Sequence, residues 1–188
     1  MRVKVTNYKA ILKILGIIIF IIGIAEVIPW IYAEVTADAA NAFAFRICAP
    51  ITIVIGFCMF IFIRSKRSRL GPREGYIVVS SCWIVASLIG AFPYLLSGFS
   101  ANYIDALFEA ASGFTTTGCT AAVGGVFSRT LLLWKAITSW LGGMGILVFV
   151  ISLLPALGIN GQFIARAETP GPVLQNTTVR LRDSAKAL

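Results

Sequence analysis

The sequence predicts an all-α integral membrane protein, with four transmembrane helices and one short re-entrant helix followed by a polar loop. Composition is the first observation behind this prediction. Of the 188 residues, 58% are hydrophobic and only 13% are charged, whereas soluble domains carry about 25% charged residues. The second observation is that the apolar residues form long blocks separated by basic clusters, as in membrane proteins.

Four apolar blocks are long enough to cross a bilayer, which takes about 20 helical residues. The first block contains Glu26, whose carboxylate we expect near the outer interface, because an unpaired charge in hydrocarbon is costly. Pro29 and Trp30 follow it as an interfacial aromatic belt rather than a signal-peptide cleavage site. The blocks cover roughly residues 10–32, 43–63, 76–97 and 131–157.

The net charge of +8 indicates orientation rather than nucleic-acid binding. Basic residues cluster at 2–9, 64–73 and 166–186, and the positive-inside rule places all three clusters on the cytoplasmic side. The N-terminus is then cytoplasmic, and the segments 33–45 and 98–130 are external. The predicted location is a cytoplasmic membrane, which the chain crosses several times, with lipid as a partner and no nucleic acid.

Residue types disfavour an enzyme or a bound cofactor. The chain has no histidine, which removes the commonest general base and metal ligand. No serine or cysteine has a candidate base nearby. The cysteines lack CxxC spacing and are interpreted as small packing residues; they are Cys48, Cys58, Cys82 and Cys119.

The segment 98–130 is too apolar for an ordinary external loop and too short for another complete span. Ser100 or Asn102 can cap a helix there, and Asp105 in its first turn complements the helix dipole. We expect Gly113 to end this helix by permitting a backbone turn. Apolar residues repeat at helical spacing along it, at Ile104, Leu107, Phe108 and Ala111.

The Thr-rich run that follows has features suited to potassium. Potassium filters replace the hydration shell with backbone carbonyls, and the residues from Thr115 to Cys119 can supply them. Gly118 permits the positive-φ conformations that help to aim successive carbonyls, and the threonines stiffen the flanking backbone. The preceding helix directs its negative end at the ion path. The sequence therefore predicts part of a potassium-selective pore, with Gly113 and Thr115 flanking the filter.

Two further features concern packing around this loop. The glycine-rich run 140–145 would let another helix backbone approach closely, as the short helix must. Glu109 lies on the short helix, and we interpret it as a structural carboxylate that pairs with its surroundings rather than as a selectivity residue.

Five stretches of the chain carry a resemblance to a known family: REGYIVV (73–79), DALFEAASGFTTTGCT (105–120), WLGGMGILVF (140–149), LLPALGINGQ (153–162) and RAETPGP (166–172). With these stretches the chain resembles the N-terminal part of a TrkH-type subunit of the Trk/Ktr/HKT superfamily of potassium transporters. The resemblance implies four helix–pore loop–helix repeats around one pore, with filter carbonyls from Thr116, Thr117, Gly118 and Cys119 and potassium held by the first three. It also implies a bacterial or archaeal cytoplasmic (inner) membrane, a homodimer and a cytosolic TrkA-type nucleotide-binding regulatory subunit.

On this interpretation the chain has three parts. Residues 1–70 form an N-terminal transmembrane helix pair, 71–160 form the first pore repeat, and 161–188 form a cytoplasmic segment leading toward a second repeat. One loop cannot enclose an ion, so we expect either a fragment of a longer subunit or a homotetrameric channel of identical chains. A non-conducting membrane scaffold is the remaining alternative, and transport by a channel or by ion-coupled symport is left open.

Overall fold

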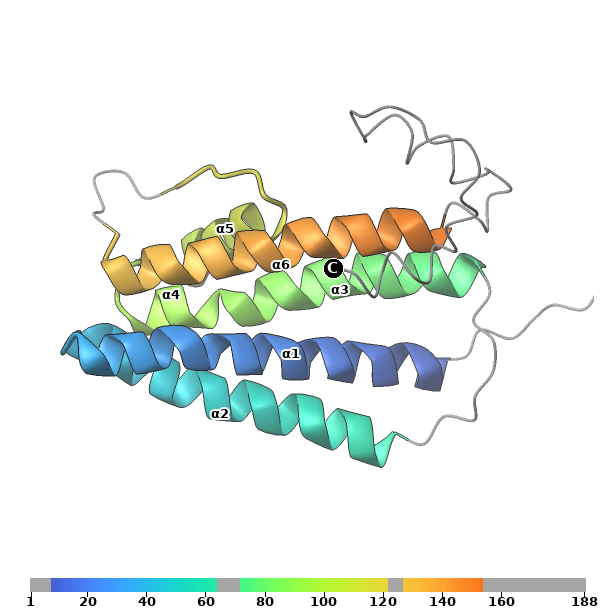
Figure 1. The fold of residues 1–188 in the computed structure, drawn as a ribbon, viewed down its shortest axis with the longest axis horizontal. Coiled ribbons are helices and arrows are strands. Elements are labelled where there is room, and N and C mark those ends of the chain that lie inside the picture. Colours follow the sequence, from blue (N-terminus) through green and yellow to red (C-terminus); the bar gives the residue numbers. More distant parts are fainter. Residues whose placement is uncertain (1–7, 64–71, 122–126, 154–188) are drawn as a thin grey trace, which may run out of the picture. The chain divides into compact units, whose positions relative to one another are not determined.

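The computed structural model describes residues 8–63, 72–121 and 127–153 of the chain, and the regular elements in these ranges are all helices. The chain divides into two compact units, Met1–Gly143 and Met144–Leu188. Both predicted domain boundaries, after residues 70 and 160, fall outside the described residues. The helices are α1 (Tyr8–Val35), α2 (Ala39–Phe62), α3 (Pro72–Gly90), α4 (Phe92–Leu96), α5 (Tyr103–Phe114) and α6 (Arg129–Leu153) (Figure 1).

The first three apolar blocks are helices of the expected length, and they are candidate membrane spans. Within the described residues, three helical stretches are long and apolar enough to cross a membrane: Tyr8–Val35, Ala39–Phe62 and Tyr76–Leu96. The third stretch is interrupted at residue 91, where α3 gives way to α4. Pro93 follows this break and cannot donate a backbone hydrogen bond. The fourth block is helical from Arg129 to Leu153, and its role as a span remains a prediction.

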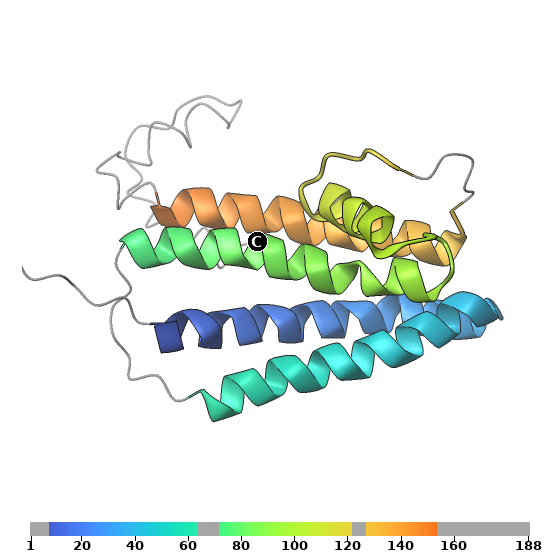
Figure 2. The ribbon, with the colours of Figure 1, turned by 180° about the vertical axis from the view of Figure 1, so that it is seen from behind.

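Glycines bring α1 and α2 into close contact, and both ribbon views show the two helices side by side (Figures 1 and 2). A Cβ added at Gly56 would lie 2.7 Å from the Phe20 Cα, and one at Gly23 would lie 2.7 Å from the Ile53 backbone nitrogen. Such distances are shorter than side-chain contacts allow, so only glycine fits. Small residues serve helix association in lipid in this way, because close backbones gain van der Waals contact.

A buried aromatic cluster joins α2, α3, α5 and α6. Trp134 of α6 is fully buried, and its ring meets Phe45 and Phe114 edge-on, with centroids 5.8 and 6.5 Å away. Its indole nitrogen donates a hydrogen bond to the Gly90 carbonyl at 3.3 Å. A Cβ at Gly90 would lie 2.6 Å from the Phe114 ring, so this glycine makes room for the last residue of α5.

The turn between α1 and α2 is tied by hydrogen bonds to the start of α6. Asp38 accepts from Asn41 at 2.8 Å and from Thr130 at 2.9 Å, while Asn41 donates to the Ser128 hydroxyl at 2.9 Å. Ser128 also accepts from the Leu131 amide at 3.2 Å, which satisfies one of the free amides that begin a helix. These bonds set where α6 begins relative to the helix pair.

We expect Glu26 near the outer interface, and its depth in a membrane stays a prediction. Within the protein its side chain is completely buried. The reason is its position on α1, because Ile22 and Pro29 lie four residues before and three after it and are buried on the same face.

Candidate functional site

Asn102 begins the short helix α5, as one of the two predicted caps. Its side-chain oxygen accepts a hydrogen bond from the Asp105 amide at 2.9 Å, and its side-chain nitrogen donates to the Asp105 carboxylate at 2.9 Å. The reciprocal pair satisfies a free amide at the helix start. Asp105 also places negative charge in the first turn, where it complements the helix dipole.

The C-terminal end of α5 differs from the sequence prediction. We expected Gly113 to end the helix by permitting a backbone turn, but the helix continues to Phe114 and the left-handed residue is Thr116, with φ of 57°. The Thr116 amide bonds to the Gly113 carbonyl at 2.9 Å, and the Thr117 amide bonds to the Ser112 carbonyl at 3.0 Å. This pair of bonds is a Schellman motif, in which glycine normally holds the position of Thr116.

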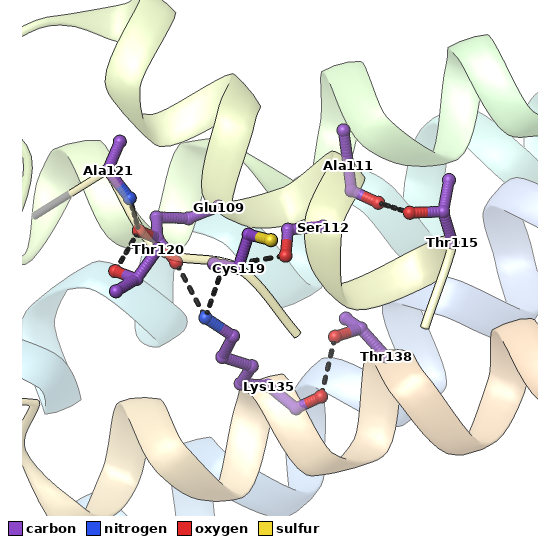
Figure 3. Close-up of polar contacts among 9 residues, drawn as sticks. All are labelled: Glu109, Ala111, Ser112, Thr115, Cys119, Thr120, Ala121, Lys135 and Thr138. Atoms are coloured by element: carbon purple, nitrogen blue, oxygen red, sulfur yellow. Dashed lines mark hydrogen bonds and ion pairs between the residues drawn. The ribbon is translucent and has the colours of Figure 1, made fainter. Parts of the chain in front are cut away.

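Gly113 instead allows α6 to approach α5. A Cβ at Gly113 would lie 3.3 Å from the Thr138 Cβ and still closer to its hydroxyl oxygen. That hydroxyl donates to the Lys135 carbonyl at 2.9 Å, which keeps it within α6 (Figure 3). Gly142, one turn after Thr138 on α6, likewise allows the two helices to approach. A Cβ at Gly142 would lie 2.7 Å from the Phe114 carbonyl carbon. The prediction that the 140–145 run supports close packing of the short helix is thereby confirmed for Gly142.

The loop from Thr115 to Thr120 is exposed in this chain and doubles back alongside α5 (Figure 2). Gly118 has φ of 75°, which confirms the positive-φ conformation expected of it. Among the described residues, none donates a hydrogen bond to the carbonyls of Thr116, Thr117 or Gly118. Within the part of the chain that the structure describes, these three successive carbonyl oxygens are therefore unoccupied acceptors.

The hydroxyls of two threonines beside these carbonyls are joined by a hydrogen bond. Thr115 donates its one hydroxyl proton to the Ala111 carbonyl at 2.7 Å, and its oxygen lies 2.7 Å from the Thr117 hydroxyl. Thr117 must then be the donor of the second bond, because a hydroxyl has a single proton. The lone pairs of the Thr117 oxygen consequently remain available as acceptors.

The Cys119 carbonyl is bonded to the protein on two sides. It accepts from the Ser112 hydroxyl at 2.6 Å and from the Lys135 ammonium at 3.0 Å (Figure 3). A carbonyl oxygen has two lone pairs, so both are engaged. Cys119 thus differs from the three residues before it, although the sequence grouped all four as filter residues.

Glu109 is the centre of a buried polar network behind the loop. Its carboxylate is 1% exposed and accepts from Lys135 at 2.8 Å, from the Ala121 amide at 2.7 Å and from the Thr120 hydroxyl (Figure 3). Burial would raise the pKa of this carboxyl, but the hydrogen bonds from Lys135, Thr120 and Ala121 outweigh it and hold the pKa below its usual value. The expected pairing of Glu109 with its surroundings is confirmed.

Lys135 is the residue of this network that the sequence reasoning missed. It lies 26 positions after Glu109, and no local pattern joins the two. The available signal was a lysine inside an otherwise apolar helix, since such a charge needs a partner.

Comparison with known proteins gives consistent matches. A family model described as TrkH, a cation transport protein, matches residues 43–188. The Trk system potassium uptake protein TrkH of Halomonas elongata is 36% identical over 97% of this chain, and that of Escherichia coli K12 is 34% identical over the same share. Each alignment covers 38% of the relative. These names describe transport proteins rather than enzymes.

A solved structure shows the same arrangement of helices. The crystal structure of the potassium transporter TrkH from Vibrio parahaemolyticus aligns with a TM-score of 0.78 and 27% sequence identity. The match covers 96% of this chain and 36% of that one. The chain therefore spans a little over a third of the length of the proteins it matches.

Proposed function

This chain belongs to the TrkH family of cation transport proteins, and we propose on that ground that it takes part in carrying potassium ions across a cytoplasmic membrane. The relatives named above are potassium uptake proteins of the Trk system. The proposed role of this chain is to supply one ion-binding loop and the helices that support it.

The carbonyls of Thr116, Thr117 and Gly118, which accept no hydrogen bond from a described residue, are the observation that carries this proposal. Backbone carbonyls replace the hydration shell of potassium in selective pores. The loop begins at the C-terminal end of α5, where the helix dipole favours a cation. We assign ion binding to these three carbonyls. The Cys119 carbonyl serves in this proposal as an anchor, because two protein donors already occupy it.

A single loop supplies only part of a ring around an ion, so other loops must complete it. We propose that they come from further repeats of a longer subunit, since the relatives extend well beyond the matched region. The alternative is a homotetramer of this chain. The mass of the purified 188-residue chain in detergent shows whether it forms a tetramer. A tetramer that conducts potassium would contradict the repeat arrangement.

The proposed setting follows the charge distribution. We propose a cytoplasmic N-terminus and an outward-facing ion-binding loop, in a subunit that dimerises and works with a TrkA-type nucleotide-binding regulator on the cytoplasmic side. The basic segments that face this side, 64–75 and 166–188, lie wholly or mostly outside the described residues.

Gly118→Ala tests the proposal in the complete transporter that carries this chain. The added methyl group would meet no described atom within 4 Å, so the change acts through the backbone. Holding a non-glycine residue at positive φ costs about 1–2 kcal/mol. We expect lower potassium uptake, or weaker discrimination against sodium, in cells that lack their own potassium uptake systems.

Gly98→Ala is the matched control. Gly98 also has positive φ, 76°, and open space around it, but it precedes α5 rather than lying in the loop. Both variants carry a similar backbone penalty, and their amounts in the membrane fraction should agree. Wild-type uptake and selectivity in Gly118→Ala would contradict the assignment of the loop, as would an equal loss in both variants.

A further inference from the structure

We propose that Lys135 and Glu109 form a positioning pair that sets the conformation of the ion-binding loop and thereby determines how strongly the pore distinguishes potassium from sodium. This inference rests on the proposed function, because it assigns the residues that hold the loop in its ion-binding form. Neither side chain is placed in contact with the ion.

Lys135 bridges two separate parts of the pore structure. Its ammonium donates to the Glu109 carboxylate on α5 at 2.8 Å and to the Cys119 carbonyl in the loop at 3.0 Å. It also lies 4.8 Å from the centre of the Phe127 ring, at a distance typical of a cation–π contact. Three partners thus fix the orientation of this ammonium group, whose side chain extends from α6.

Glu109 holds the same part of the loop from the other side. It accepts from the Ala121 amide at 2.7 Å and from the Thr120 hydroxyl. Three consecutive loop residues, from Cys119 to Ala121, are therefore bonded to one ion pair. Hydrogen bonds to charged groups are about twice as strong as neutral ones, so this ion pair holds residues 119 to 121 firmly.

Among the described residues, the ion-binding loop is open around Gly118. Its incoming limb is held by the Schellman motif at Thr116 and Thr117. Around Gly118, by contrast, even an added Cβ would touch no described atom within 4 Å. The direction of the Gly118 carbonyl depends on the peptide that it shares with Cys119, whose own carbonyl is bonded to Lys135. Loss of that bond would let the distances between the loop carbonyls vary. Discrimination between potassium and sodium by ion size depends on those distances.

The positive charge of Lys135 and the negative charge of Glu109 also neutralise each other beside the proposed cation path. The side chain of Lys135 is 15% exposed and that of Glu109 is 1% exposed, so removing one partner leaves the other charge poorly solvated. Glu109→Gln leaves an excess positive charge, which repels cations, and Lys135→Met leaves an excess negative charge, which attracts them. The two variants have opposite effects on charge, but both loosen the loop.

This difference in sign provides the test, in the complete transporter expressed in cells without their own potassium uptake. Uptake of potassium and of sodium is measured for wild type, Glu109→Gln and Lys135→Met. We expect discrimination between the ions to fall about tenfold in both variants, equivalent to about 1.4 kcal/mol. The apparent affinity for potassium should fall in Glu109→Gln and rise or stay level in Lys135→Met.

Conservative and matched variants separate positioning from charge. Lys135→Arg keeps the charge and several donors, so it should retain most of the discrimination. The charge reversal Glu109→Lys with Lys135→Glu restores attraction but leaves the Cys119 carbonyl without its ammonium donor, so it should not. The control is the exposed pair of Arg46 and Glu34, 2.5 Å apart, where Arg46→Met should leave both ions' uptake unchanged.

Ser112→Ala keeps the test decisive if a charge variant fails to reach the membrane. It removes the other donor to the Cys119 carbonyl, at 2.6 Å, without changing any charge, and discrimination should fall here too. Wild-type discrimination in Lys135→Met or Ser112→Ala would overturn the inference, as would rescue by the charge reversal. Absence of potassium uptake by the wild-type transporter would instead refute the proposed function.

Discussion

Gly142→Ala should separate α6 from α5 at the residue where the ion-binding loop begins. The added Cβ would lie 2.7 Å from the Phe114 carbonyl carbon and 3.1 Å from its Cα. Nonbonded carbon atoms prefer about 3.5–4.0 Å, so one backbone must move by about 1 Å. Phe114 is the last residue of α5. A shift of its backbone therefore also shifts Thr115, the first residue of the loop.

The expected cost follows from the nature of the clash. The opposing atoms belong to the backbone rather than to a flexible side chain, so no rotamer change relieves it. Overpacking of this kind costs about 1–3 kcal/mol. We expect a lower melting temperature of the detergent-solubilised transporter, together with reduced potassium uptake per molecule in the membrane.

Gly143→Ala is the control in the same helix. A Cβ at Gly143 would meet the Thr116 methyl group at 3.9 Å, an ordinary van der Waals distance. The two variants gain the same helix propensity and differ in the clash. Equal melting temperatures and equal uptake in the two variants would refute the packing argument for Gly142.

Three other perturbations test the surrounding structure. Gly56→Ala places a Cβ 2.7 Å from the Phe20 Cα and should destabilise the protein by about 1–3 kcal/mol, seen as a lower melting temperature with unchanged ion discrimination. Asn102→Ala removes the cap on the Asp105 amide and should cost about 1 kcal/mol, which Asn102→Ser should restore. The pKa of Glu109 is lowered from 4.5, so its contribution to stability should be complete above pH 4.5 and disappear as the pH falls through the lower, folded-state value. The melting-temperature difference between wild type and Glu109→Gln, followed against pH, measures this, and a difference that grows below pH 4.5 would contradict it.

Local features of the chain were predictable. The Asn102 cap, the positive φ of Gly118 and the first three apolar helices depend on residues close in sequence or on hydrophobic length. The end of α5 was predicted at Gly113, where a glycine usually closes a helix. It lies instead after Phe114, and Gly113 makes room for Thr138 of α6.

The sequence by itself determined that the chain is a membrane protein, that a short capped helix precedes the loop, and that a glycine in the loop takes positive φ. These features follow from composition, spacing and backbone preference. Only the tertiary structure decided that Lys135 meets Glu109 and Cys119, and that Gly113 and Gly142 lie against the opposite helix. Those features depend on the rotation and approach of α5 and α6, which are set by contacts between residues 16 to 28 positions apart. Pairing over such distances is a property of packed helices, and no local pattern encodes it.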